Sequence, residues 1–140
     1  MSKQFHFTLS SPDAVLFDGE VEVLSLTTPN GEISILADHE PLVSLIAPGV
    51  MTIKDKSGEK TLATGSGFVK VSPEKVKAFT QTAEYAESID EQRAIEAKRQ
   101  AKNIMAQKAD EVSLADATAL LERNIARLKV LERKKRKHSG

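Results

Sequence analysis

The spacing of hydrophobic residues changes once along this chain, near residue 88. Before that point, apolar residues stand mostly at every second position, in short runs separated by polar residues. A period of two is typical of strands with one buried face. Two turn signals, Asn30-Gly31 and Asp55-Lys56-Ser57-Gly58, lie between such runs and predict hairpins. The runs are Phe5, Phe7 and Leu9; Val21, Val23, Leu24 and Leu26; Ile33, Ile35 and Leu36; Met51 and Ile53; Leu62 and Ala63; Phe68, Val69 and Val71; and Val76, Ala78 and Phe79.

From residue 88 onward, apolar residues recur three and four positions apart, which is the period of an amphipathic helix. Ser88 with Glu91 fits a capping box and predicts the start of one helix, and Ser113 with Asp116 predicts the start of a second. The two apolar stripes are Ala94, Ala97, Ala101, Ile104 and Met105, and then Leu114, Ala117, Leu121, Ile125, Leu128 and Leu131. Two helices joined by a short loop form an antiparallel hairpin, in which we expect these stripes to face each other.

Arginine, proline and glycine divide the chain at the same place. All six arginines follow residue 92, every proline lies at or before Pro73, and every glycine except Gly140 lies at or before Gly67. We therefore expect an antiparallel β-sandwich (flattened barrel) over residues 1–84 and an antiparallel two-helix hairpin over residues 85–140. An alanine-lined hairpin buries little area, so it should be marginal alone, as a conformational switch requires.

The net charge of zero conceals an asymmetry between these two parts. Residues 1–84 carry seven lysines and 11 acidic residues, a net −4, whereas residues 85–140 carry 13 basic and nine acidic residues, a net +4. The basic half suggests an acidic partner: protein, nucleotide, nucleic acid or lipid headgroup. The densest run, Arg133-Lys134-Lys135-Arg136-Lys137-His138, favours a solvated helix end. Contact with nucleic acid or lipid stays open, although the run lacks aromatic residues that stack on bases.

Several chemistries are disfavoured by what the sequence lacks. Cysteine is absent, which excludes disulfides and thiolate metal sites. No apolar run approaches the roughly 18 residues that span a bilayer, and residues 1–6 lack a signal-peptide core, so we expect a cytosolic address. No glycine-rich phosphate loop occurs, and His6, His39 and His138 lack metal-ligand spacing. We expect neither a metal site nor catalysis, because Asp38-His39-Glu40 has no neighbouring nucleophile.

Four charged residues of the helical part are spaced to form an anion site. Asp90 and Arg93 are three positions apart, and Arg123 and Arg127 are four apart, so each pair shares a helix face. If the hairpin folds back on itself, three guanidiniums could converge on one anion, and a triphosphate has the right size and charge. Asp90 would hold one arginine or accept from a base or ribose. The same spacings are those of ordinary surface ion pairs, and both interpretations stay open.

Three segments resemble the epsilon subunit of bacterial F-type ATP synthases. Residues 30–42 resemble the signature GELGILPGHxPL, with departures at Ser34 and at Ala37-Asp38. Residues 64–71 resemble the stretch SGGFLEV with one glycine lost, and residues 89–94 match the motif I/L-D-x-x-R-A. The signature is matched at Gly31, Glu32, Ile35, Leu36, His39, Pro41 and Leu42. The resemblance covers nearly the whole chain, in the family's order.

This resemblance implies a rotor component without an active site of its own. In the family, the sandwich joins the gamma subunit to the membrane-embedded ring of c subunits, and Glu32 and His39 match the loop that faces the ring or its neighbours. The hairpin lies folded on the sandwich or extends along gamma into the catalytic head. There its basic residues face the beta (and alpha) subunits and ATP hydrolysis is inhibited. The implied location is peripheral, on the cytoplasmic side of the bacterial inner (plasma) membrane. Membrane association is indirect, through the complex, and no nucleic acid is involved.

The resemblance also implies a nucleotide site. The I/L-D-x-x-R-A motif binds ATP in several members, and the matching contacts here are Glu84, Ile89, Asp90, Arg93, Ala94, Arg123 and Arg127. No cofactor is required; ATP, alone or with Mg, would be a regulatory ligand. Members that bind ATP weakly also carry the motif, and there its residues serve hairpin packing or interdomain salt bridges. The alternative function is a free-standing β-sandwich binding module whose basic helical arm takes nucleic acid or an acidic protein.

Overall fold

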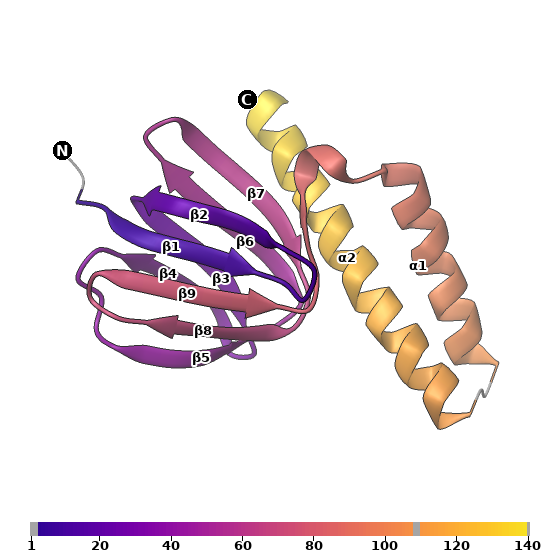
Figure 1. The fold of residues 1–140 in the computed structure, drawn as a ribbon. Helices are drawn as coiled ribbons and strands as arrows, with labels where there is room; N and C mark the ends of the chain where they lie inside the picture. Colours follow the sequence, from indigo (N-terminus) through magenta and orange to yellow (C-terminus); the bar gives the residue numbers. More distant parts are fainter. Residues whose placement is uncertain (1–2, 108–109, 140) are drawn as a thin grey trace.

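Two five-stranded sheets form the first part of the computed structural model, which describes residues 3–107 and 110–139 (Figure 1). The first sheet holds, in spatial order, β2 (Val15–Val21), β1 (Phe5–Ser10), β9 (Lys75–Thr80), β8 (Gly67–Val71) and β5 (Leu42–Ile46). The second holds β10 (Ala83–Tyr85), β7 (Gly58–Thr64), β6 (Gly49–Asp55), β3 (Val23–Thr28) and β4 (Gly31–Leu36). The predicted antiparallel sandwich is confirmed, with one parallel pair, β1 and β9, that the pattern did not indicate.

The apolar residues at alternating positions meet between the two sheets. In β1, Phe5, Phe7 and Leu9 are buried, while the residues between them are only half-buried. The same core contains the fully enclosed side chains Val21, Leu24, Leu26, Ile35, Met51, Ile53, Leu62, Val69 and Val71. Burying one such side chain contributes about 1.5–3 kcal/mol, so this core dominates the stability of the sandwich.

Glycines fix the chain path at both predicted hairpins. Gly31 has φ 122° in the turn between β3 and β4, and Gly58 has φ 133° in the turn between β6 and β7. Side chains with a Cβ rarely adopt this region, so glycine is favoured there. Gly67 is needed for another reason: a Cβ at this position would lie 1.9 Å from the carbonyl oxygen of Phe79 on β9. Both predicted hairpins are therefore confirmed.

The predicted run from Val21 to Leu26 is wrong as a single strand. β2 ends at Val21 in the first sheet, and β3 begins at Val23 in the second. At the crossing point, the Glu22 N–H donates to the carbonyl oxygen of Lys54 at 2.8 Å. Residues on both sides of the crossing face the same core, but the buried positions shift by one residue there, from Val21 to Leu24 and Leu26.

Two helices complete the fold, and each begins at an aspartate instead of the predicted serine. The 3-10 turn η1 spans Ala86–Ser88, α1 spans Glu91–Ala106 and α2 spans Glu111–Ser139. The Asp90 carboxylate accepts from the Arg93 N–H at 3.2 Å, and the Asp110 carboxylate accepts from the Ser113 N–H at 2.8 Å. Ser88 lies in η1, two residues before the cap. Serine and aspartate are comparable caps, so residue type alone could not separate the two positions.

Helix α2 lies between the sandwich and α1 (Figure 1). One face of α2 packs on the second sheet and η1, in a cluster of Val50, Ala63, Ala86, Ala126 and Val130. Toward α1, the predicted alanine stripe is buried at Ala94 and Ala101. Ile104 and Leu114, which the stripes also include, are exposed. The sequence pattern predicted one buried face on α2, whereas in the structure one face of α2 packs on the sandwich and another packs on α1.

Candidate functional site

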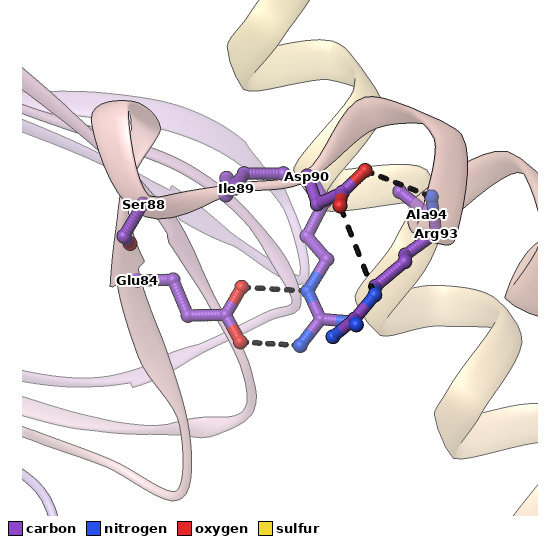
Figure 2. Close-up of a pocket in the computed structure, with 7 residues that line it drawn as sticks. Glu84, Ser88, Ile89, Asp90, Arg93 and Ala94 are labelled. Carbon is purple, nitrogen blue, oxygen red and sulfur yellow. Dashed lines mark hydrogen bonds and ion pairs between the residues drawn. The ribbon is translucent and has the colours of Figure 1, made fainter.

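A pocket of about 360 Å³ opens where the helices meet the sandwich (Figure 2). β10, η1, the start of α1 and the middle of α2 all contribute to its wall. The lining residues are Glu84, Ser88, Ile89, Asp90, Arg93, Ala94 and Arg127. Six of the seven predicted nucleotide contacts thus lie around one pocket, although they come from positions up to 43 residues apart.

A two-pronged ion pair between Arg127 and Glu84 crosses the pocket and joins α2 to β10. Nε of Arg127 donates to one carboxylate oxygen of Glu84 at 2.6 Å, and Nη2 donates to the other (Figure 2). The side chains of Arg127 and Glu84 are 21% and 33% exposed. A bidentate guanidinium–carboxylate pair is directional, and partial burial protects it from screening. This pair fastens the hairpin to the sandwich.

The Arg127 guanidinium has capacity left for a ligand. Nη1 donates to Oδ1 of Asn124 at 3.0 Å, which together with the Glu84 contacts uses three N–H groups. An arginine side chain has five N–H groups. The other two find no acceptor among the described residues and are available to an anion in the pocket.

Asp90 and Arg93 place a second guanidinium at the pocket mouth. Nε of Arg93 lies 3.7 Å from an Asp90 carboxylate oxygen, and the same carboxylate caps α1 (Figure 2). The Arg93 side chain is 90% exposed, so it can turn toward a ligand at little cost. Because the N-terminus of α1 opens here, its unpaired N–H groups and helix dipole also favour an anion.

Arg123 stands apart from the other two predicted arginines. It lies outside the pocket and lines a separate cavity of about 60 Å³ beside Gly65, Ser66, Gln81 and Thr82. Helix α2 crosses the end of the sandwich there, so the residue one turn before Arg127 meets the strand loops instead of α1. The structure therefore brings two of the three predicted guanidiniums together, and Arg123 is not the third.

Tyr85 holds the strand that carries Glu84. Its hydroxyl donates to the carbonyl oxygen of Leu16 on β2, in the opposite sheet, at 2.8 Å. Burial raises the pKa of the Tyr85 hydroxyl, which keeps it a donor. No pattern in the sequence indicated β10, because three residues are too few to show a period.

Glu32 and His39, the residues expected to contact other subunits, lie at opposite ends of β4. Glu32 accepts from Nη2 of Arg133 on α2 at 3.0 Å. His39 follows the strand, and its Nδ1 donates to the carbonyl oxygen of Glu40 at 2.7 Å. Glu32 is the second residue of β4 and His39 lies three residues past its end, so the stretch of strand from Glu32 to Leu36, about 13 Å long, lies between them. They are not one local site. The side chains of Lys137 and His138, in the predicted basic run, lie outside the described residues.

An apolar surface that the sequence did not reveal lies on the outer face of the first sheet. Val43 and Leu45 on β5 are 72% and 65% exposed, and Phe68 on β8 is 51% exposed. Leu45 pairs with Phe68, which stacks on Phe79 of β9 at 5.8 Å between ring centroids. Adjacent exposed apolar side chains of this kind mark contact surfaces. We call Val43, Leu45, Phe68 and Phe79 the β5–β9 surface.

The described residues contain neither a metal cluster nor a membrane-spanning helix. Within 3–107 and 110–139, no group of three or more His, Asp or Glu residues is arranged to hold a metal ion. No helix of that part is long and apolar enough to cross a membrane.

Family models define the class of protein to which this sandwich and hairpin belong. The family model described as "ATP synthase, Delta/Epsilon chain, beta-sandwich domain" matches residues 4–86. The model described as "ATP synthase, Delta/Epsilon chain, long alpha-helix domain" matches residues 87–132. The chain is 35% identical over 132 residues to the ATP synthase epsilon chain of Clostridium novyi, covering 94% of this chain and 100% of that protein. It is 31% identical over 128 residues to the ATP synthase epsilon chain of Bacillus velezensis, covering 91% and 97%. The chain belongs to the epsilon-chain family of F-type ATP synthases.

Solved structures show the same architecture. A chain in the cryo-EM structure of the Euglena gracilis mitochondrial ATP synthase, OSCP/F1/c-ring in rotational state 1, superposes with a TM-score of 0.75 at 27% identity, covering 85% of this chain and 76% of that one. A chain from the Tetrahymena thermophila mitochondrial ATP synthase, central stalk and c-ring, gives a TM-score of 0.60 at 11% identity, covering 93% and 98%. The second likeness bears on the fold alone.

Proposed function

We propose that this chain is a non-catalytic rotor subunit that couples gamma to the c ring and restrains ATP hydrolysis through its helical hairpin. Its relatives are named ATP synthase epsilon chains, and a chain at 27% identity occurs in an assembly with the c-ring. The corresponding location is peripheral, on the cytoplasmic side of the bacterial inner membrane. The beta and alpha subunits would receive the hairpin in its extended form.

The observation that carries the regulatory part is how the hairpin sits on the sandwich. Two ion pairs join α2 to the sandwich, Arg127–Glu84 and Arg133–Glu32 at 3.0 Å, and a third, Lys134–Glu87 at 3.7 Å, joins α2 to η1. The apolar contact beneath them consists of alanines and valines, which bury little area each. Such a contact can open reversibly, and the released arginines and lysines would then be free to face an acidic partner surface.

ATP is the ligand that best fits the pocket between hairpin and sandwich. A volume of about 360 Å³, two guanidiniums and a helix N-terminus suit a triphosphate. Because the pocket wall comes from both parts, a ligand bound there favours the compact arrangement, in proportion to its affinity difference between the two arrangements. Glu84 and Asp90 supply acceptors for a base or ribose.

Calorimetric titration with ATP and with MgATP tests the ligand. We expect binding by wild type, loss of at least tenfold in affinity in Arg127→Ala, and a smaller loss in Arg93→Ala. Arg123→Ala is the matched control, since Arg123 lies outside the pocket, and it should bind within about twofold of wild type. Absence of binding up to millimolar ATP would make the pocket purely structural.

The β5–β9 surface is the proposed contact with gamma. Leu45→Lys with Phe68→Glu should abolish recovery of this chain with gamma, without unfolding it, because both side chains are largely exposed. Substituting Lys54, on the opposite sheet, by glutamate serves as the control. Recovery of the double variant with gamma at the wild-type level would exclude this surface.

For the hairpin, truncation after Glu87 tests inhibition directly. The assembled complex should hydrolyse ATP faster without residues 88–140, and unchanged hydrolysis would contradict the proposal. The alternative, a free-standing module with a basic helical arm, predicts recovery with nucleic acid or an unrelated acidic protein and without synthase subunits.

A further inference from the structure

We infer that Asn124 is a positioning residue of the pocket, which orients the Arg127 guanidinium and thereby sets how the pocket presents it to an anionic ligand. The inference rests on the proposed nucleotide site and deepens it. Among the described residues, Asn124 is the one fully buried polar side chain of the helices; the other buried polar residues, Thr28, Thr64 and Thr80, belong to the sandwich. A buried amide in a thinly packed helix pair needs a physical reason.

The hydrogen bonds of Asn124 define the orientation of its amide. A guanidinium can only donate, so the atom that faces Arg127 must be Oδ1, at 3.0 Å from Nη1. Nδ2 then points the other way and donates to the carbonyl oxygen of Leu120 at 2.8 Å. Both ends of the amide are therefore satisfied, and reversing it would oppose two donors at one end and two acceptors at the other.

The helix period places Asn124 at the right point to act on Arg127. Asn124 shares a face of α2 with Ala117, Leu121 and Leu128, opposite the face on which Ala126 and Val130 meet the sandwich. Three residues turn an α-helix by about 300°, so Arg127 projects from the flank of the Asn124 face, into the groove that holds the pocket. An apolar residue at position 124 would fill the space of the Asn124 side chain equally well, but it would leave Nη1 of Arg127 without an acceptor.

Together with Glu84, Asn124 fixes all three nitrogens of the guanidinium. Glu84 holds Nε and Nη2, and Asn124 holds Nη1. Glu84 alone would let the plane of the group rock about the shared edge. With the third contact the plane is fixed, and the remaining N–H groups point in set directions before any ligand arrives. Pre-organisation of this kind raises affinity by removing an ordering cost from binding.

The test compares Asn124→Leu, which keeps the forked shape, with Asn124→Ala, which guards against overpacking. Leu121→Ala is the matched control, because Leu121 lies on the same face and has no polar contact to Arg127. Three quantities are measured on the full chain: the midpoint of thermal unfolding, the ATP affinity by calorimetry, and the Arg127 Nε–H signal by NMR without ligand.

We expect Asn124→Leu to unfold at the wild-type temperature or above it, to bind ATP about tenfold more weakly, and to shift or broaden the Arg127 Nε–H signal. Leu121→Ala should lower the midpoint and leave that signal in place. A purely structural role predicts that affinity follows the unfolding midpoint in all three variants, and that outcome would overturn the inference. If wild type binds no ATP, the proposed nucleotide function fails, while the Nε–H signal still decides the inference. A signal unchanged in both Asn124 variants refutes it.

Discussion

The sandwich core and the contact between hairpin and sandwich differ in the residues that form them. We call this contact, formed by Val50, Ala63, Ala86, Ala126 and Val130 with the ion pairs around them, the seat of the hairpin. The core encloses large apolar side chains, among them Phe7, Leu24 and Met51, at zero exposure. The seat joins alanines and valines, such as Ala126 and Val130, to a ring of ion pairs led by Arg127–Glu84. Hydrophobic stabilisation grows with buried area, while partly exposed ion pairs contribute little each and are screened by salt. The comparison teaches that burial holds the two sheets together more strongly than alanine contacts and ion pairs hold the hairpin on the sandwich.

Truncation in the core should have the largest effect on this comparison. Phe7→Ala should lower the free energy of unfolding of the sandwich by about 3–5 kcal/mol, because it removes a buried ring and leaves a cavity. Val130→Ala, on the seat, should cost about 1.5 kcal/mol for two lost methyl groups and should act on hairpin docking alone. Denaturant unfolding measures the first and hydrogen exchange in α2 the second. If Val130→Ala lowered protection in β1 and β9 as well, the two regions would be one cooperative unit.

Removal of the Arg127–Glu84 pair should come next in size. Arg127→Ala leaves Glu84 without its partner. Because the side chains of Arg127 and Glu84 are 21% and 33% exposed, we expect a loss of about 1–2 kcal/mol in hairpin docking. Hydrogen exchange of α2 amides at low and high salt measures it. The control is Arg99→Ala, since Arg99 pairs with Glu96 on the exposed side of α1. Equal effects of the two variants would show that docking does not depend on this pair.

The sandwich could be predicted from the sequence to a much greater extent than the seat. Alternation at Phe5, Phe7 and Leu9 and the two glycine turns are local signals, with a period of two or a required φ. The contact between Glu84 and Arg127 joins residues 43 positions apart, and its geometry depends on how α2 crosses the sheet. Helical spacing could place Arg123 and Arg127 on related faces, but it could not show that the crossing sends Arg123 to the strand loops. Nothing in the sequence marked Asn124 as a buried residue, because the predicted stripe runs through its neighbours Leu121, Ile125 and Leu128.

Replacement of the α1 cap should have a smaller, local effect. Asp90→Ala removes the acceptor of the Arg93 N–H and should destabilise the start of α1 by about 1 kcal/mol, read as lost helicity and faster exchange in its first turn. Ser88→Ala, the residue that the sequence favoured as the cap, should change the first turn by less than about 0.5 kcal/mol. The reverse order would mean that α1 begins at η1.

Titration of His6 should have the smallest effect on stability. It should act on the sandwich and leave the docking of the hairpin unchanged. On the outer face of the sandwich, His6 contacts Glu20 at 3.0 Å through Nδ1 and Asp18 at 2.6 Å through Nε2. The hydrogen bond with Glu20 has the larger effect and the one with Asp18 the smaller, and both raise the pKa of His6 above its ordinary value of about 6.5. The folded state therefore binds this proton more tightly than the unfolded state. The stabilisation is complete below pH 6.5 and is lost as the pH rises through the folded-state pKa.

The unfolding midpoint of the sandwich should therefore fall slightly over that pH window, and His6→Gln should remove this component. Hydrogen exchange in α2, corrected for the intrinsic rate at each pH, should not follow the His6 titration, because the ion pairs of the seat join arginine and lysine to glutamate. A matching change in α2 protection, abolished by His6→Gln, would show that the outer sheet and the seat are coupled. Protonation of His6 on the first sheet would then change how firmly the hairpin docks on the second sheet.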